Sequence, residues 1–512
     1  MRVPLNVSRR KSALTTLAGG ATNTLIVSIQ AIVLTPIYLH EIGPRLYGAW
    51  LGSGDILVWL QAFDLGLPNL MIQRIGAAHG RGDSREVSEY FATGAAVLGL
   101  VACMATFFAF FLSHLIPGWM GLSGSEAREL ELCFFVGSLA AAVIIFNNSA
   151  VGFSRGIQDT TAMNLVVLIS SLAGFAMSLG LVLTGHGLWA IALGLATRAV
   201  ISLCGSLFFV ASHFRGGMFR FFRVRRQKLR EFLLVSPITA ISGLSYAMMN
   251  QSESALVAFF IKPELAAVLT VTRKAADLIR SLVDMIGFAA YGSFAHLIAS
   301  EERHRALQVH AEISSLRLSF AIVLASAYIA VNASLVSVWV GSSQYGGHLL
   351  TIMMALQIIV VGGSYLMNYL YRATGPVIRG SIALVVESAA RIPMMIGFLL
   401  WLGLPGIPLA GIVTAGLSGF WAYRWTVKDL ATYAVPAVKT LPVVWLTRFL
   451  VFAVGLMACL LIHVETWTYV IATGFTLTII GGLCLLSIDP QLRYARMQLV
   501  ALHKRLNWMK VA

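Results

Sequence analysis

Charged residues are scarce in this chain. Asp, Glu, Lys and Arg together make up 12% of its 512 residues, whereas soluble globular domains carry roughly 25%. Apolar residues make up 58% of the chain, and its mean hydropathy is +0.81. This composition excludes a soluble globular protein. It predicts an all-α polytopic membrane protein, because a helix satisfies its own backbone hydrogen bonds inside a bilayer.

Residues that hold metals or form disulfides are also few. The five cysteines lie far apart in apolar segments without a CxxC pair, and the histidines form no HExxH motif. The sequence also lacks a P-loop, a dinucleotide-binding glycine motif and a nucleophile elbow. We therefore expect no metal, no cofactor and no enzymatic activity.

Long apolar runs are abundant. A helix needs about 20 apolar residues to cross the hydrocarbon core, and we count fourteen such segments. The expected spans are residues 13–39, 47–73, 91–115, 131–153, 160–184, 187–212, 231–259, 265–298, 317–339, 348–371, 376–402, 406–426, 443–463 and 466–487. The predicted fold is a bundle of about fourteen transmembrane helices.

Lysine and arginine are distributed unevenly over the connections between these spans. The side of the two termini holds 28 of the 37 basic residues, Arg317 among them, and the opposite side holds three. The other six, Arg448 among them, lie within spans. Because cytoplasmic loops are enriched in Lys and Arg, both termini are predicted to be cytoplasmic. The net charge of +15 is thereby explained, and we expect no nucleic acid partner.

A basic and aromatic connection at residues 213–230 separates two sets of six spans. Each set has a similar turn after its first helix, at residues 43–46 (Gly-Pro-Arg-Leu) and 262–265 (Lys-Pro-Glu-Leu). Repeated halves are common in alternating-access transporters. We predict a six-helix bundle with its linker at 1–230, a second bundle at 231–442, an added helix pair at 443–487 and a cytoplasmic amphipathic tail at 488–512. The tail is expected to lie on the inner leaflet or to pack on the bundle.

Five charged residues interrupt the predicted span at 265–298. They are Arg273, Lys274, Asp277, Arg280 and Asp284. Four of them share one helix face at spacings of three and four, which also lets them pair with one another. A charge at bilayer mid-depth costs about 2.5–3.5 kcal/mol on insertion scales, so this face should meet protein or water rather than lipid. The stripe either lines a substrate cavity or forms an ion-pair seam between helices.

Other polar residues fall inside the predicted spans. Arg198 lies in a span without an acidic residue, so it needs a partner from another helix or a ligand phosphate, which a guanidinium binds well. Asn250 and Gln251 form a polar patch that we also assign to the cavity. Glu387 and Arg391 are four residues apart and are expected to form a structural ion pair.

Three carboxylates are candidates for ion coupling. Asp64 stands close to Gly66 and Pro68, where a helix can bend or unwind, so it is either a hinge with an ion site or the cap of a broken helix. Glu253 and Asp55 are the other two. A carboxylate that lacks a partner in a low dielectric binds a proton readily, and both H⁺ and Na⁺ are candidate coupling ions.

The segment from Leu39 to Arg74 carries a family resemblance. It combines the turn glycine Gly43, the pair Tyr47-Gly48 at the start of a helix, and the run Asp64-Leu65-Gly66-Leu67. This segment resembles the polysaccharide-transport branch of the multidrug/oligosaccharidyl-lipid/polysaccharide exporter superfamily, the Wzx-type flippases of O-antigen and exopolysaccharide synthesis. The fourteen spans, the two six-helix halves and the added helix pair also fit this family.

The resemblance implies a protein of the bacterial inner membrane. It would move undecaprenyl-pyrophosphate-linked oligosaccharide from the cytoplasmic to the periplasmic leaflet by rocking two bundles, with ion coupling. A polysaccharide polymerase and its chain-length machinery would be potential partners. Two alternatives stay open: an ion-coupled exporter of small molecules or drugs, and a membrane polysaccharide polymerase or ligase. The enzyme would need a large outer loop, whereas the longest here covers only residues 116–130.

Overall fold

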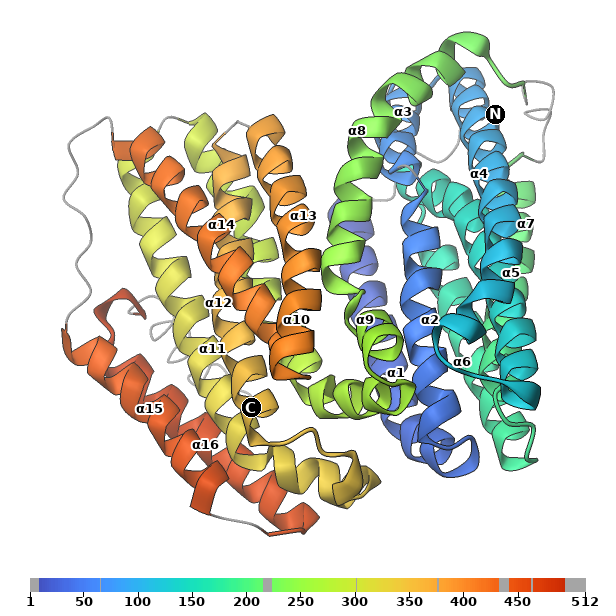
Figure 1. Cartoon of the computed structure of the whole chain (residues 1–512). Helices are drawn as coiled ribbons and strands as arrows, with labels where there is room; N and C mark the ends of the chain where they lie inside the picture. The colour runs from blue at the N-terminus through green and yellow to red at the C-terminus, as the bar shows by residue number, and fades with distance from the viewer. Residues whose placement is uncertain are drawn as a thin grey trace, which may run out of the picture. The chain divides into compact units, whose positions relative to one another are not determined.

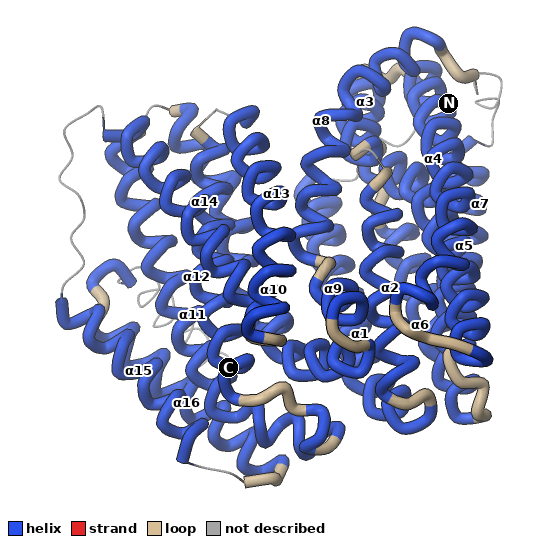
Figure 2. Tube along the Cα trace, viewed as in Figure 1, coloured by secondary structure: helices blue, strands red, loops and turns tan. Residues whose placement is uncertain are grey.

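The structure is a computed structural model, and it describes residues 9–64, 66–214, 223–300, 302–374, 377–431, 442–461 and 464–492. Within these residues every regular element is a helix (Figures 1 and 2). Contacts divide the chain into two compact units, Met1–Ala267 (unit 1) and Val268–Ala512 (unit 2). Each unit has its own set of packed helices.

Unit 1 contains nine complete helices among the described residues and the start of a tenth. They are α1 (Arg9–Glu41), α2 (Pro44–Ala62), α3 (Leu67–Gly80), α4 (Ser84–Trp119), α5 (Gly124–Gly156), α6 (Thr161–Leu183), α7 (Trp189–Phe214), α8 (Arg226–Asn250), α9 (Glu253–Phe260) and the first turn of α10 (Pro263–Ala299). The prediction of one continuous helix at 231–259 is wrong, because α8 ends and α9 begins within this range.

Unit 2 contains the rest of α10 and six further α-helices of the described residues. They are α11 (Arg303–Val340), α12 (His348–Ala373), α13 (Val377–Leu402), α14 (Gly406–Ala431), α15 (Pro442–Leu461) and α16 (Trp467–Ile488), with short 3-10 turns η2 (Ser342–Gln344) and η3 (Pro490–Leu492). The middle of the basic linker, 215–222, and the tail from residue 493 onward, for which an amphipathic helix was predicted, lie outside the described residues.

The outer faces of the helices are apolar. Phe107, Phe108 and Phe111 on α4 are more than half exposed, and so are Ile471 and Phe475 on α16. So large an exposed apolar surface would be unfavourable in water, whereas it is compatible with contact to lipid chains. Twelve helical segments of the described residues are long and apolar enough to cross a membrane. The prediction of an all-α polytopic membrane protein is confirmed. The predicted spans seven and eight, now α8–α9 and α10, are outside this count, so the total of fourteen is approximate.

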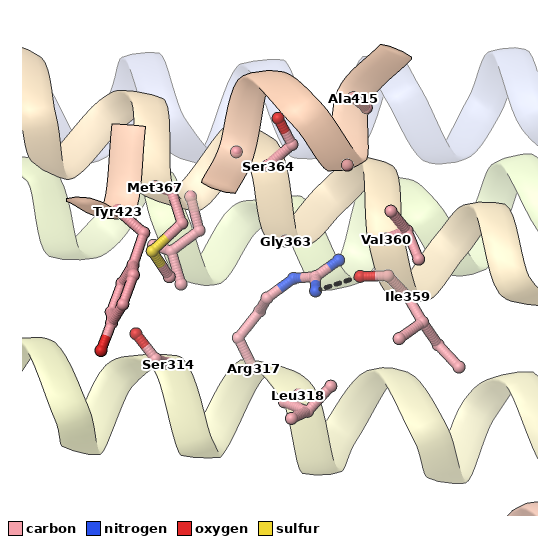
Figure 3. A pocket seen from close by; sticks show the side chains of 13 residues that line it. Ser314, Arg317, Leu318, Ile359, Val360, Gly363, Ser364, Met367, Ala415 and Tyr423 are labelled. Carbon is pink, nitrogen blue, oxygen red and sulfur yellow. Dashed lines mark hydrogen bonds between the residues drawn. The ribbon is translucent and has the colours of Figure 1, made fainter. Parts of the chain in front are cut away.

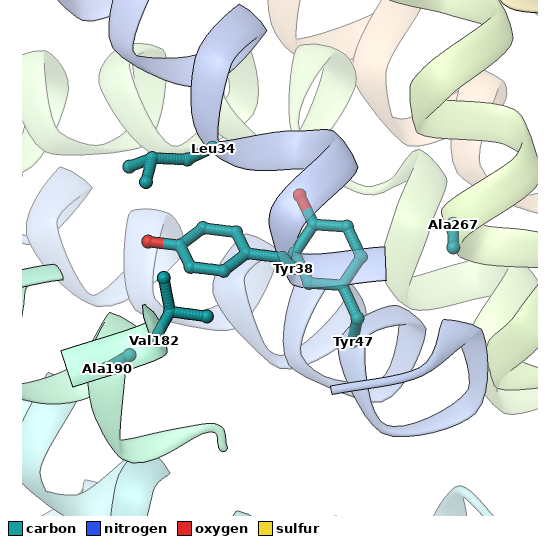
Figure 4. Close-up of a cluster of buried hydrophobic side chains, with 6 residues drawn as sticks. All are labelled: Leu34, Tyr38, Tyr47, Val182, Ala190 and Ala267. Carbon is teal, nitrogen blue, oxygen red and sulfur yellow. The ribbon is translucent and has the colours of Figure 1, made fainter. Parts of the chain in front are cut away.

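Helices in unit 1 approach one another closely where they carry small residues. The pair α6 and α7 is an example: a Cβ atom on Gly174 would stand 2.8 Å from the carbonyl oxygen of Gly194. Such crossings are typical of membrane helices, which associate by close packing because lipid provides no hydrophobic driving force. Unit 1 also contains an apolar cluster of buried side chains (Figure 4), which comprises Leu34, Tyr38, Tyr47, Val182, Ala190 and Ala267.

The two similar turns of the sequence contact each other in unit 1. Arg45 Nε lies 3.8 Å from a carboxylate oxygen of Glu264, and a Cβ atom on Gly48 would collide with the carbonyl oxygen of Pro263. Helices α8 and α9 also pack on α2. The contacts therefore divide the chain after Ala267, whereas the sequence analysis expected a division after residue 230. The repeat and the four-part division stay predictions.

Ion pairs at the start of α8 explain why this helix belongs to unit 1. Glu89 of α4 contacts Arg225 at 3.0 Å and Lys228 at 3.3 Å. Glu231 pairs with Arg74 of α3. The end of the basic linker is thus held on α3 and α4 by opposite charge.

In unit 2 the added pair α15 and α16 packs on α11. Arg448 of α15 donates to Asp489, just after α16, at 2.9 Å, and both side chains are at most 3% exposed. Ser315 and Ser319 of α11 accept further hydrogen bonds from Arg448. A buried polar junction therefore fixes the added pair to the unit.

Candidate substrate and coupling sites

The candidate coupling residue Asp64 lies in a break between α2 and α3. One carboxylate oxygen accepts a hydrogen bond from the Gly66 amide at 2.9 Å, and the other accepts one from the Asn148 side chain of α5 at 3.3 Å. Gly66 has φ 62°, a conformation that glycine adopts without strain. Asp64 therefore caps a broken helix and also contacts a neighbouring span. Its role in ion coupling stays a prediction.

The polar side chains continue across α5 to α7. Asn147, the neighbour of Asn148, donates to the Ser202 hydroxyl of α7 at 2.8 Å. The Asn147 Oδ1 atom is buried and accepts no hydrogen bond from the described residues. Ser202 follows Arg198 by one helical turn. We call Asp64, Asn147, Asn148, Arg198 and Ser202 the polar belt of unit 1.

Arg198 is the cation of this belt. Its stem packs at the close α6–α7 crossing, where a Cβ atom on Gly174 would lie 2.9 Å from the Arg198 Cβ. The side chain is half-buried, and it makes no hydrogen bond or ion pair with any described residue. A charge inside a span without a counter-charge is unfavourable. A ligand anion would compensate it, and the planar guanidinium fork suits phosphate oxygens.

Asp55 of α2 has a structural contact at the second helix break, between α8 and α9. Its Oδ2 atom accepts a hydrogen bond from the Ala255 amide at 2.9 Å. The first amides of a helix have no partners within the helix, and a carboxylate there is favoured by the helix dipole. Asp55 therefore caps α9 from another helix. Whether it also couples an ion stays a prediction.

The other polar residues of this break are held in the same way. Trp59, one turn after Asp55, donates to the carbonyl oxygen of Gln251 at 2.7 Å. The Asn250 side chain donates to Tyr246 of its own helix at 2.9 Å. Glu253 begins α9 and is 4% exposed. These contacts fix the break against α2, and the cavity and coupling roles assigned to it stay predictions.

The charged stripe of α10 belongs to unit 2. Arg273 and Asp277 form an ion pair at 3.1 Å, with Asp277 the more exposed partner. Lys274 and Arg280 are half-buried. Asp284, at the end of the stripe, lies near both Arg280 and Arg317 of α11. The stripe is thus partly neutralised by its own residues and partly by the neighbouring helix.

Arg317 is the residue that the sequence analysis misplaced. It was counted among the cytoplasmic connections, but it is 2% exposed inside α11. Its guanidinium donates to the carbonyl oxygens of Ile359 and Ile358 of α12, both at 2.7 Å. A Cβ atom on Gly362 would collide with this guanidinium and would stand 2.8 Å from the Asp284 carboxylate. The signal for it was the absence of any Pro or Gly between Arg303 and Val340, which lets one helix run through the position.

Glu387 and Arg391 form a buried ion pair on α13, each side chain 2% exposed. The Arg391 Nε atom also donates to the Thr414 hydroxyl of α14 at 3.0 Å. This pair is satisfied within unit 2, unlike Arg198 in unit 1.

The residues predicted from the sequence to form the site are divided between the two units. Asp55, Asp64, Arg198, Asn250, Gln251 and Glu253 lie in unit 1, and Arg273, Lys274, Asp277, Arg280, Asp284, Glu387 and Arg391 lie in unit 2.

Known proteins resemble this chain in sequence and fold. Residues 16–297, more than half of the chain, match the model of the polysaccharide biosynthesis protein family. A Shigella flexneri protein named "Putative O-antigen transporter" is 26% identical over 200 residues, which are 39% of this chain and 46% of that protein. The alignment thus spans less than half the length of that relative.

Solved structures share the fold. An inward-facing multidrug resistance transporter of the MATE family, in the MOP superfamily, has a TM-score of 0.68 at 15% identity and covers 79% of this chain and 96% of its own. The lipid II flippase MurJ, in an inward closed conformation, has a TM-score of 0.64 at 13% identity, with 91% and 98% covered. The resemblance stated from the sequence is confirmed. The chain belongs to the polysaccharide biosynthesis protein family, and its helices are those of a polytopic membrane protein.

Proposed function

We propose that this protein translocates undecaprenyl-pyrophosphate-linked oligosaccharide from the cytoplasmic to the periplasmic leaflet of the bacterial inner membrane by alternating access. The observation that carries the proposal is the position of Arg198. Its guanidinium lies inside a span and forms no hydrogen bond or ion pair with the described residues. The family membership, the O-antigen transporter relative and the fold shared with a lipid flippase support it.

The substrate's pyrophosphate matches the chemistry of Arg198. A guanidinium offers two parallel N–H groups to phosphate oxygens, and the energetic disadvantage of the bare charge disappears when the anion is bound. Neighbouring Asn147 and Ser202 are uncharged and can bond sugar hydroxyls or phosphate oxygens. The charged stripe of α10, from Arg273 to Asp284, is proposed as a further set of substrate contacts, within unit 2.

Ion coupling is assigned to Asp64. Its carboxylate stands at a helix break, where a change of charge would alter the bonds to Gly66 and Asn148 and so the geometry of the break. Glu253 and Asp55 are kept as further coupling candidates. Asp55 is the weaker of the two because its charge already serves the α9 terminus.

The excess of Lys and Arg on one side supports an orientation with both termini in the cytoplasm. When Arg317 is counted within a span instead of among the cytoplasmic connections, the excess of Lys and Arg on the side of the termini remains. A polysaccharide polymerase with its chain-length machinery is proposed as the protein partner, because it would consume the substrate after translocation. Fusing a reporter enzyme that is active only in the periplasm to either terminus tests this orientation. Activity of the fused reporter would contradict a cytoplasmic location of that terminus.

A second candidate function is ion-coupled export of a small cationic molecule. The shared fold with a multidrug transporter favours it. The basic residues Arg198, Arg273 and Arg280 oppose it, because a cation would be repelled by them. The two functions differ in the charge of the cargo, so one assay separates them.

The test is leaflet exchange of a fluorescent undecaprenyl-pyrophosphate oligosaccharide in proteoliposomes. Wild type should exchange the lipid, Arg198→Gln should abolish exchange, and Arg198→Lys should retain part of it because the charge remains while the fork is lost. Arg305→Gln, an exposed arginine at the start of α11, is the matched control and should behave as wild type. Wild-type transport of a cationic dye without lipid exchange would overturn the proposal.

A further inference from the structure

Unit 2 contains a cavity between α11, α12 and α14 (Figure 3). Its volume is about 330 Å³, at the lower end of the range for ligand pockets. It is too small for an oligosaccharide but large enough for part of a lipid. The cavity lies within one unit and is separate from the polar belt around Arg198.

Arg317 forms part of the cavity wall. Figure 3 shows its guanidinium lying along α12 beside Gly363, with a hydrogen bond to Ile359. Two of its nitrogen atoms donate to carbonyl oxygens, while the buried Nε atom has no hydrogen-bond partner among the described residues. Asp284 and Arg280 are the charged neighbours on α10. Among the residues that line the cavity, Arg317 is the charged one.

The rest of the lining is apolar with a few hydroxyl groups. Leu318, Val360 and Met367 give it aliphatic surface, and Ser314, Ser364 and Tyr423 give it hydroxyl groups. A ligand that matches both parts has an apolar chain and an anionic oxygen group. Phosphate is the group that guanidinium and hydroxyl donors recognise together.

The cavity borders the outer face of α14. Tyr423, in its wall, is 46% exposed, and the adjacent Phe420 and Trp421 are about half exposed. In a membrane helix such a face meets lipid, so a lipid can reach the cavity sideways. Arg424 and Lys428, in the last two turns of α14, are exposed and attract anionic head groups to the same end of the helix.

We propose that this cavity is a binding site for a phosphate-bearing membrane lipid, with the phosphate held by Arg317 and the chain along the aliphatic wall. Glycerophospholipids and polyprenyl phosphates share this chemistry. The inference does not rest on the proposed transport function, because binding is measured without translocation.

The test is retention of lipid by the purified full chain, measured by native mass spectrometry after detergent extraction. The protein is first incubated with phosphatidylglycerol, undecaprenyl phosphate or diacylglycerol, which lacks phosphate. The decisive variant is Gly416→Leu, which fills the cavity without strain at the backbone, since a Cβ atom there meets only Val360 at 3.6 Å. Gly482→Leu on α16, where a Cβ atom meets nothing within 4 Å, is the matched control.

Wild type and Gly482→Leu should retain at least one phosphate lipid and no diacylglycerol, and Gly416→Leu should retain about tenfold less of that lipid. Which of the two phosphate lipids is retained identifies the source. Equal retention of diacylglycerol, no retention by wild type, or undiminished retention by Gly416→Leu would overturn the proposal. Arg317→Lys should reduce the preference for phosphate over diacylglycerol, and an unchanged preference would also contradict it.

Discussion

Replacing Gly362 by alanine should destabilise the protein through Arg317. The new Cβ atom would collide with the guanidinium and approach the Asp284 carboxylate to 2.8 Å. Because the α12 backbone is held in a helix, the Arg317 side chain has to move. It would then lose its bonds to the carbonyl oxygens of Ile358 and Ile359, both now 2.7 Å long.

The expected magnitude follows from three contributions. A hydrogen bond from a charged donor contributes about 1.5–3 kcal/mol, so losing both bonds costs about 3–6 kcal/mol when no new partner is found. Alanine in place of glycine in a helix returns about 1 kcal/mol. The net loss expected for Gly362→Ala is therefore about 2–5 kcal/mol, a large fraction of the stability of a typical domain.

Thermal unfolding of the detergent-solubilised protein, followed by tryptophan fluorescence, measures this effect. Gly362→Ala should lower the midpoint clearly. Gly363→Ala, whose Cβ would stand 3.1 Å from the same guanidinium, should lower it less. Gly416→Ala, with its 3.6 Å contact to Val360, should leave it unchanged or raise it slightly. If the three midpoints are equal, the contact of Arg317 with α12 does not stabilise the unit and the reasoning fails.

Three further predictions concern the other polar contacts. Asp55→Ala should lower the free energy of unfolding by about 1 kcal/mol and Asp55→Asn by less, because an amide oxygen still caps α9; equal midpoints for both variants and wild type would refute the cap. Arg448→Met should cost about 3–5 kcal/mol, since it leaves Asp489 buried and charged. Adding Asp489→Leu should restore most of this loss, whereas additive losses in the double-mutant cycle would contradict the pairing. Asp64→Asn should remove any stimulation of lipid exchange by an ion gradient, and stimulation that persists in this variant would exclude Asp64 as the coupling site.

The helical membrane fold was predictable because it depends on local properties of the chain. Hydropathy over about 20 residues identifies a span whatever its neighbours are. The break at Asp64 was also anticipated, since Gly66 and Pro68 are local signals. The end of α8 at Asn250 was not, because no Pro or Gly marks it and its stability comes from Asp55 and Trp59 of a distant helix.

The buried charges were harder to place because their partners are far away in the sequence. From the sequence, Arg317 was assigned to the basic connection at the end of a span. The carbonyl oxygens of α12 that accept its hydrogen bonds lie 42 and 41 residues away. Arg448 was recognised as lying within a span, but its partner Asp489 comes 41 residues later. Glu387 and Arg391 are four residues apart on one helix, as are Arg273 and Asp277. These two pairs were predictable because the pairing is contained in the local sequence.

The central claim is that the protein recognises the pyrophosphate of a lipid-linked oligosaccharide and carries it across the membrane. The most direct measurement compares leaflet exchange by the wild-type protein for two substrates with the same glycan and polyprenyl chain, one with the pyrophosphate and one with a neutral linkage. We predict exchange of the pyrophosphate substrate at a rate about tenfold higher or more, as loss of a charged contact implies. Equal rates for the two substrates, or no exchange of either, would contradict the account.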